Sequence, residues 1–186
     1  MIIYIHGFAS SAFGEKAQKL KEYFDDELIA LSLPTIPNLA IANLEQLIES
    51  YVSIDEEVSL IGSSLGGFYS IYLANKYDLK AVLINPAVYP WRELHRYENQ
   101  ELITNYYDGS KFEFTTNHLN SFKNYKVDSL TTPTNFLTLL QEGDEVLDFN
   151  EAADYLESTE LIIEEGGNHS FEEIERYFRK ISTFFR

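Results

Sequence analysis

The stretch VSLIGSSLGG at residues 58–67 decides how the rest of the sequence is interpreted. Its first four residues form a short apolar run of the kind found in buried strands, and a helical pattern follows it. Between the two, Gly62, Ser64 and Gly66 make the pattern G-x-S-x-G, whereas Ser63 lacks glycine at the matching positions. Such a strand-to-helix turn lifts the serine above the sheet, and its glycines are needed because a Cβ would collide with neighbouring backbone. We therefore expect a nucleophile elbow with Ser64 at its apex.

Short apolar runs alternate along the chain with longer segments of helical period, which is typical of βαβ units and a mostly parallel sheet. We predict strands at residues 2–5, 28–31, 58–61, 81–84, 135–140 and 161–163. Helices are predicted at residues 15–24, 39–51, 65–77, 150–157 and 171–185. The last segment has apolar residues at i, i+3, i+4 and i+7 spacing, so we expect it to pack on the sheet.

One stretch, at about 89–128, departs from this pattern. Asn, Tyr and Phe interleave there without a clean period, and Pro86 and Pro90 lie close to its start. A chain of 186 residues with 45% hydrophobic composition can bury one ordinary core and leaves little room for a second. We expect one domain over residues 1–186, with an irregular, cap-like excursion from the sheet.

Composition excludes several classes of function. The chain has no cysteine, so disulfides, thiolate catalysis and Cys-ligated metal sites are excluded. A net charge of −16 and scattered basic residues disfavour nucleic acid and acidic membrane surfaces as partners. No apolar run is long enough to span a membrane and no signal peptide is recognisable, so we expect a cytoplasmic protein. The metal and nucleotide motifs are absent, so neither a metal nor a cofactor is expected.

A serine hydroxyl is a weak nucleophile, so Ser64 requires a histidine to take its proton and an acid to orient that histidine. His169 lies in the loop EGGNHSF, residues 165–171, between the last predicted strand and the last predicted helix. Asp144 lies between the serine and this histidine in the sequence, after a strand and a Gly-Asp turn, with Val146 and Leu147 to anchor its loop. The nearby acids Glu142, Glu145 and Asp148 are competitors, chiefly Asp148.

Five blocks spread over nearly the whole chain carry a resemblance to a known family: YIHGF (4–8), IGSSLGG (61–67), NPA (85–87), GDEVLD (143–148) and GGNH (166–169). Together they resemble the α/β-hydrolase superfamily and, more closely, its small YqiA-like esterase family. The resemblance implies a three-layer α/β-hydrolase fold with a mostly parallel central sheet flanked by helices. It also implies hydrolysis of acyl esters, or of thioesters, through a Ser-His-Asp triad and an acyl-enzyme intermediate.

Further expectations depend on this fold. Its oxyanion hole takes one backbone N–H from the residue after the nucleophile, here Leu65, and one from the loop after the opening strand, here Phe8. His6 precedes the serine and ends a strand, so we interpret it as a structural histidine that shapes the oxyanion loop rather than as the base. The chain begins at that strand, so the first antiparallel strands of larger relatives are missing, and the exposed edge would favour a homo-oligomer.

Other functions remain open at this level. The aromatic residues between positions 89 and 128 either line the acyl pocket or pack the excursion onto the body of the protein. A non-catalytic binding module of the same fold would present its acidic or aromatic surface to a protein partner. Amide or peptide cleavage would share the triad and differ only in the pocket for the leaving group.

Overall fold

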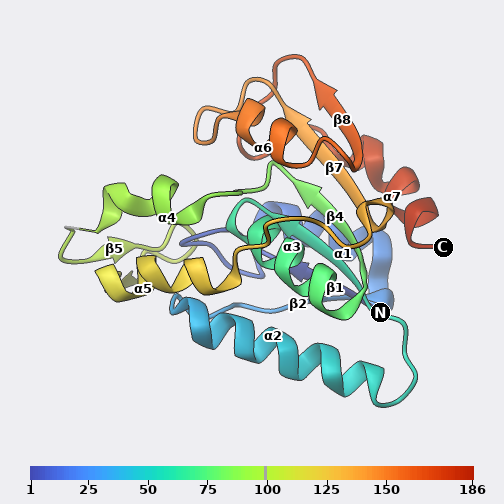
Figure 1. Ribbon diagram of the computed structural model, residues 1–186, viewed down its shortest axis with the longest axis horizontal. Helices are drawn as coiled ribbons and strands as arrows, with labels where there is room; N and C mark the ends of the chain where they lie inside the picture. The colour runs from blue at the N-terminus through green and yellow to red at the C-terminus, as the bar shows by residue number, and fades with distance from the viewer. Residues whose placement is uncertain (99) are drawn as a thin grey trace.

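The computed structural model describes residues 1–98 and 100–186, and its centre is a parallel β-sheet (Figure 1). The strands follow the order β2-β1-β3-β4-β7-β8, and each pair of neighbours is parallel. Their bounds are β1 (Ile2–Ile5), β2 (Leu28–Ala30), β3 (Ser59–Ser63), β4 (Lys80–Ile84), β7 (Phe136–Gln141) and β8 (Glu160–Glu164). The predicted parallel sheet is therefore confirmed.

Helices cover both faces of this sheet, as the prediction required. On one face lie α1 (Glu15–Phe24) and α7 (Phe178–Phe185), and on the other lie α2 (Pro37–Val52), α3 (Leu65–Tyr77) and α6 (Phe149–Tyr155). Successive side chains of β3 point to opposite faces, so Leu60 joins the second layer and Ile61 the first. Both faces are buried, which explains why the central strands are continuous apolar runs rather than alternating ones.

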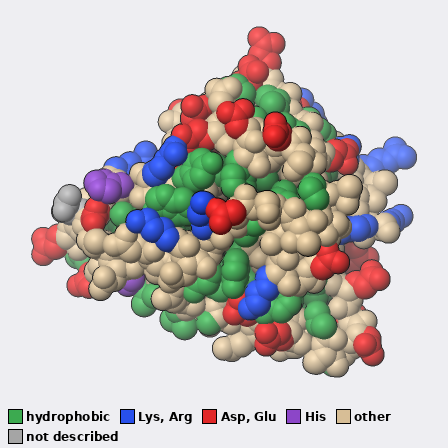
Figure 2. All heavy atoms as spheres, viewed as in Figure 1, with side chains coloured by type: hydrophobic (Ala, Val, Ile, Leu, Met, Phe, Trp, Pro, Cys, Tyr) green, Lys and Arg blue, Asp and Glu red, His purple; other side chains and the backbone are tan. Residues whose placement is uncertain are grey.

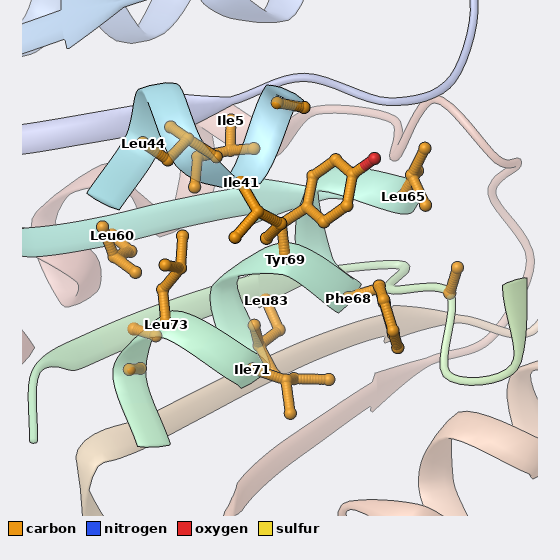
Figure 3. Packing of buried hydrophobic residues seen from close by; sticks show 14 of the residues in the cluster. Ile5, Ile41, Leu44, Leu60, Leu65, Phe68, Tyr69, Ile71, Leu73 and Leu83 are labelled. Carbon is orange, nitrogen blue, oxygen red and sulfur yellow. The ribbon is translucent and has the colours of Figure 1, made fainter. Parts of the chain in front are cut away.

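The larger of the two cores is built around α3 (Figure 3). Phe68, Tyr69 and Leu73 of α3 are buried in this core together with residues of α2 and of the sheet, and the Phe68 ring also contacts the rings of Trp91 and Phe122. Because this helix is apolar on nearly every side, it is a core helix fixed by its neighbours on all faces. The elbow that precedes α3 is consequently held by a rigid element.

The segment predicted as an irregular excursion contains short regular elements. They are α4 (Pro90–Glu93), the antiparallel pair β5 (Ile103–Thr104) and β6 (Lys111–Phe112), and α5 (Thr116–Ser121). Figure 1 shows this segment beyond one end of the strands, and we refer to it as the cap. Phe114 and Phe122 are buried in the core cluster of α3, so part of its aromatic content packs the cap onto the body.

The predicted helix over residues 171–185 is wrong in its first half. Phe171 and Glu173 have φ angles of 63° and 54°, which no helix accommodates, and a 3₁₀ turn at Ile174–Tyr177 precedes α7. Phe171 and Ile174 are nevertheless buried in the same cluster as Ile181. The apolar spacing thus reported burial correctly, although the backbone that carries it is not helical.

The surface is acidic without a single acidic patch on the face seen in Figure 2. Asp and Glu side chains are spread over this face with Lys and Arg among them. Within the ranges 1–98 and 100–186, no helix combines the length and apolarity needed to cross a membrane.

Candidate active site

The turn between β3 and α3 has the strained geometry expected of a nucleophile elbow. Ser64 has φ 55° and ψ −123°, a region that residues with a Cβ rarely occupy. A Cβ on Gly62 would lie 2.3 Å from the Gly66 carbonyl oxygen, and one on Gly66 would lie 1.9 Å from the Ile5 carbonyl oxygen. Both positions therefore exclude every residue except glycine, as the sequence pattern predicted.

Three side chains from distant parts of the sequence meet at this turn. His169 Nε2 lies 3.0 Å from Ser64 Oγ, and His169 Nδ1 lies 2.9 and 2.8 Å from the two carboxylate oxygens of Asp144. The Asp144 side chain is only 1% exposed and that of His169 is 21% exposed. A buried carboxylate thus faces one nitrogen of the imidazole while the other nitrogen faces the serine at the edge of the cavity.

Two of the competing acids, Asp148 and Glu145, have hydrogen-bond partners other than the His169 ring. Asp144 Oδ1 accepts hydrogen bonds from the backbone N–H groups of Val146 and Leu147, which fix the carboxylate toward His169. Asp148 is exposed and accepts from the N–H of Asn150 as the N-cap of α6. Glu145 accepts the backbone N–H of His169 at 3.0 Å, and this bond lowers the pKa of the Glu145 carboxyl.

Two buried amides hold the loop that carries His169, and the sequence interpretation missed their role. Asn85 and Gln141 are each 2% exposed. Asn85 Nδ2 donates to the carbonyls of Asn168 and His169, and Asn85 Oδ1 accepts from the Gln141 N–H. Gln141 Oε1 accepts the N–H groups of Asn168 and Glu172 at 3.2 and 2.8 Å. Their sequence signals were a polar residue at the end of each of two apolar strands and, for Asn85, its place in the NPA block.

The loop that follows β1 lies close to Ser64. A Cβ on Gly7 would lie 3.0 Å from Ser64 Cβ, so the loop backbone passes directly over the elbow. The N–H groups of Phe8 and Leu65 donate to no acceptor in the part of the chain that the structure describes. His6 is buried; its Nε2 accepts the Leu33 N–H, so Nδ1 carries the proton donated to the Gly7 carbonyl.

A cavity of about 860 Å³ opens at Ser64 and His169. Its lining includes the apolar and aromatic side chains of Phe8, Leu94 and Tyr97, and also the charged cap residues Glu93 and Arg96. The ring centroids of Phe8 and Tyr97 are 5.2 Å apart, so the loop after β1 and the cap are in contact. The described ranges of the chain contain no cluster of His, Asp and Glu arranged to hold a metal ion.

The model of the Uncharacterised protein family (UPF0227) matches residues 1–186. The chain belongs to this family. UPF0227 relatives include the protein ECA1814 of Pectobacterium atrosepticum, 26% identical over 191 residues that cover 99% of this chain and 98% of the relative. YcfP of Salmonella paratyphi A is also 26% identical, over 189 residues, with the same shares of both chains covered.

This UPF0227 chain shares its fold with solved α/β-hydrolase structures, as the resemblance implied. It is similar to Est1E of Butyrivibrio proteoclasticus with bound ferulic acid, with TM-score 0.75, 15% identity, and 98% and 86% of the two chains covered. A monoacylglycerol lipase of Paleococcus ferrophilus gives TM-score 0.72 and 17% identity, with 99% and 93% covered. At these identities the similarity establishes the α/β-hydrolase fold and not the reaction.

Proposed function

We propose that the protein is a serine hydrolase that cleaves acyl esters or thioesters through an acyl-enzyme on Ser64. The observation that carries this proposal is the continuous line of hydrogen-bonding contacts from Ser64 Oγ through His169 to the buried Asp144 carboxylate. Such a line is what a hydroxyl needs to become a nucleophile near neutral pH. The strained backbone of Ser64 supports the same conclusion, because strain of this kind concentrates at functional sites.

In the first half of the reaction, Ser64 Oγ attacks the carbonyl carbon while His169 Nε2 takes the hydroxyl proton. Asp144 keeps the other imidazole proton on Nδ1 and stabilises the imidazolium that forms. The carbonyl oxygen becomes an oxyanion, for which the unoccupied Phe8 and Leu65 N–H groups are the proposed donors. When the tetrahedral intermediate collapses, His169 returns the proton to the leaving alcohol or thiol, and the acyl group stays on Ser64.

In the second half, water takes the place of the alcohol. His169 removes a proton from the water, the resulting hydroxide equivalent attacks the acyl carbon, and the proton then passes to Ser64 Oγ as the acid leaves. The same N–H groups serve both tetrahedral intermediates. The apolar wall formed by Phe8, Leu94 and Tyr97 is the proposed surface for the hydrophobic part of the substrate.

Solved structures with the same fold support ester chemistry, since they include an esterase of Pyrococcus furiosus and the monoacylglycerol lipase. A non-catalytic binding module, the second candidate, would not need a strained serine or a buried carboxylate aligned on one histidine. Amide cleavage shares all of these features, so it is separated by assaying the ester, thioester and amide of one acyl group in parallel.

The proposal is tested by intact-protein mass after exposure to a fluorophosphonate, which reacts with activated serines only. We expect a single adduct on wild-type protein, located at Ser64 by peptide mass and absent from Ser64→Ala. The surface variant Ser53→Ala serves as control and should label like wild type. Folded wild-type protein that fails to label, or labels elsewhere, would support the binding module instead.

A further inference from the structure

Lys16 is a charged residue of the cavity that the proposed chemistry leaves without a role. It lies in the first turn of α1 and lines the cavity that opens at Ser64. Its Nζ donates to Ser63 Oγ at 2.6 Å, and Ser63 directly precedes the proposed nucleophile. An ammonium group has three N–H donors, and the Ser63 hydroxyl accepts only one of them. The other two donors remain available to a group in the cavity.

The ion pairs of the described residues do not include Lys16, although carboxylates share the cavity wall with it. Glu15 pairs with Lys19, and Glu173 pairs with Arg176. Glu93 accepts the N–H of Tyr89, and Glu172 accepts from Asn168 Nδ2. Lys19, one turn further along α1, is bound by both Glu15 and Glu175. The two lysines of this helix therefore differ in their partners. Among the described residues, Lys19 is paired with carboxylates and Lys16 is not.

The position of Lys16 is unfavourable for a cation. Burial lowers its pKa to about 7, and the charge of Asp144 only partly opposes this. The N-terminal end of a helix carries partial positive charge, which adds to the cost of an ammonium in the first turn. Burial without a counter-ion is costly in itself, so the residue weakens the fold unless something negative occupies the cavity.

The end of α1 offers further donors beside Lys16. The N–H groups of Glu15, Lys16 and Ala17 have no intrahelical acceptor, and the N-cap Gly14 has no side chain to cap them. No other acceptor for these groups lies in residues 1–98 or 100–186. Gly14 and Ala17 line the same cavity as Lys16. A negatively charged oxygen placed there would meet the ammonium and the helix N-terminus together.

We propose that Lys16 and the N-terminus of α1 form a subsite for an anionic group, a carboxylate or a phosphate, so that the substrate is an ester with a negatively charged end. This inference rests on the proposed ester hydrolysis and names the class of substrate for the same site. On the cap side the cavity is lined by Phe8, Leu94 and Tyr97 together with the charged residues Glu93 and Arg96, whereas Lys16 and Ser63 line it near α1. The substrate thus combines an apolar portion with an anionic end.

The test compares matched esters that differ by one negative charge. One pair is the mono-p-nitrophenyl ester of adipic acid and its methyl ester, which carry the charge on the acyl side. The other pair is 4-carboxyphenyl butyrate and its methyl ester, which carry it on the alcohol side. Each pair is assayed with wild type, Lys16→Met and the control Lys19→Met, because both variants remove one positive charge from the same helix.

We expect wild type to prefer the anionic member of at least one pair by about tenfold or more in kcat/KM, the scale of one charge-assisted contact. Lys16→Met should abolish this preference, whereas Lys19→Met should keep it. An equal loss on charged and neutral esters would instead mean that Lys16 acts through Asp144, and would overturn the subsite.

The pH dependence gives a second readout. In the ratio of the two kcat/KM values the ionisation of the triad cancels, because both esters use the same Ser64, His169 and Asp144. Burial also raises the pKa of Tyr4, another residue of the cavity wall, so this phenol stays neutral. The preference should be largest below pH 7 and fall as the pH rises through about 7, where Lys16 loses its proton. A ratio that does not change with pH would contradict the assignment.

Binding to Ser64→Ala separates this inference from the proposed function. By calorimetry this inactive variant should bind the anionic esters about tenfold or more tightly than the neutral ones, and Ser64→Ala/Lys16→Met should not distinguish them. If wild type hydrolyses no ester but this binding difference persists, the proposed hydrolysis fails and the anion subsite stands. If neutral esters are hydrolysed and no charge preference is found in rate or binding, only the subsite is wrong.

Discussion

Ser64 occupies a backbone conformation that costs free energy, and the surrounding residues hold it there. Its φ of 55° lies where strain of about 1–3 kcal/mol is typical for a residue with a Cβ. Its N–H donates to the Ile84 carbonyl, and its carbonyl accepts from Gly67 and Ala87. Three backbone hydrogen bonds thus offset the strain and fix the direction of the Ser64 side chain.

The acid of the proposed triad can be tested with two matched substitutions. Asp144→Asn should lower kcat by roughly 10³–10⁴-fold, because an amide no longer keeps the imidazole proton on Nδ1. Asp148→Asn should leave kcat within about twofold, since Asn caps a helix as well as Asp does. Both changes remove one charge and preserve shape. Steady-state kinetics in which Asp148→Asn is the damaging change would contradict the assignment of Asp144.

Lys16 should also affect stability, with a definite dependence on pH. Its pKa of about 7 lies below the ordinary value of 10.5, so the folded state disfavours the charged form. The cost is complete below about pH 7 and disappears as the pH rises toward about 10.5, where the unfolded chain also loses the proton.

We therefore expect Lys16→Met to unfold at higher urea concentration than wild type at about pH 6, with the difference shrinking by about pH 9.5. Lys19→Met should show no such gain, because Lys19 is ion-paired. A Lys16→Met that is less stable than wild type at pH 6 would show that the lysine contributes to the fold rather than to ligand binding.

At the scale of elements, the position of His169 depends on a loop between β8 and α7 that has little regular structure. Asn85 follows β4 and Gln141 ends β7, so two neighbouring strands each extend one amide under this loop. Each amide binds the loop through backbone groups. His169 is thereby held in place by the sheet, although it lies outside the strands.

Removing one of these amides should reduce activity as well as stability. Gln141→Met retains similar volume but leaves the Asn168 and Glu172 N–H groups without their acceptor, at a cost of about 1–3 kcal/mol. We expect a lower kcat and slower fluorophosphonate labelling. Thr138→Val, in the same strand, loses its hydrogen bond to Thr159 and should cost stability without slowing labelling. Equal labelling rates in the two variants would mean that Gln141 does not position the histidine.

The sequence predicted elements best where apolar pattern and glycine turns coincide. The bounds of β1, α1 and α3 are those expected from the residues alone. The start of α7 was wrong because Phe171 and Ile174 continue the apolar spacing while the backbone turns at Phe171 and Glu173. The spacing of apolar residues predicts which side chains are buried, but it does not predict the φ angles of the backbone between them.

At the scale of the whole molecule, the excess of acidic residues should destabilise the fold through self-repulsion. The net charge is −16, and the acids are spread over the face seen in Figure 2. We expect the Tm to rise by several degrees as NaCl increases from about 0.01 M to about 0.5 M, because salt screens the repulsion. Choline chloride should give the same rise. A Tm that falls or stays constant would show that repulsion is not a significant cost.

The parts of the proposed site that follow from motifs and their order in the sequence could be predicted. The parts that depend on contacts between residues far apart in the sequence could not. Ser64, Asp144 and His169 follow from a turn motif, from the order of residues and from the need for a base. The contact between Lys16 and Ser63 joins residues 47 positions apart, and Lys16 lies in an ordinary amphipathic helix. Nothing in its local sequence distinguishes it from Lys19, so only the fold reveals that, among the described residues, Lys19 has ion-pair partners and Lys16 has none.

The most direct test of the central claim is the hydrolysis of p-nitrophenyl butyrate by wild type and by Ser64→Ala of equal folded content. We predict turnover by wild type and a loss of about 10⁴-fold or more in kcat for the variant, since the other groups cannot replace the nucleophile. Turnover that survives in Ser64→Ala would contradict the assignment of Ser64, and a folded wild type with no turnover of any ester would contradict the proposed hydrolysis.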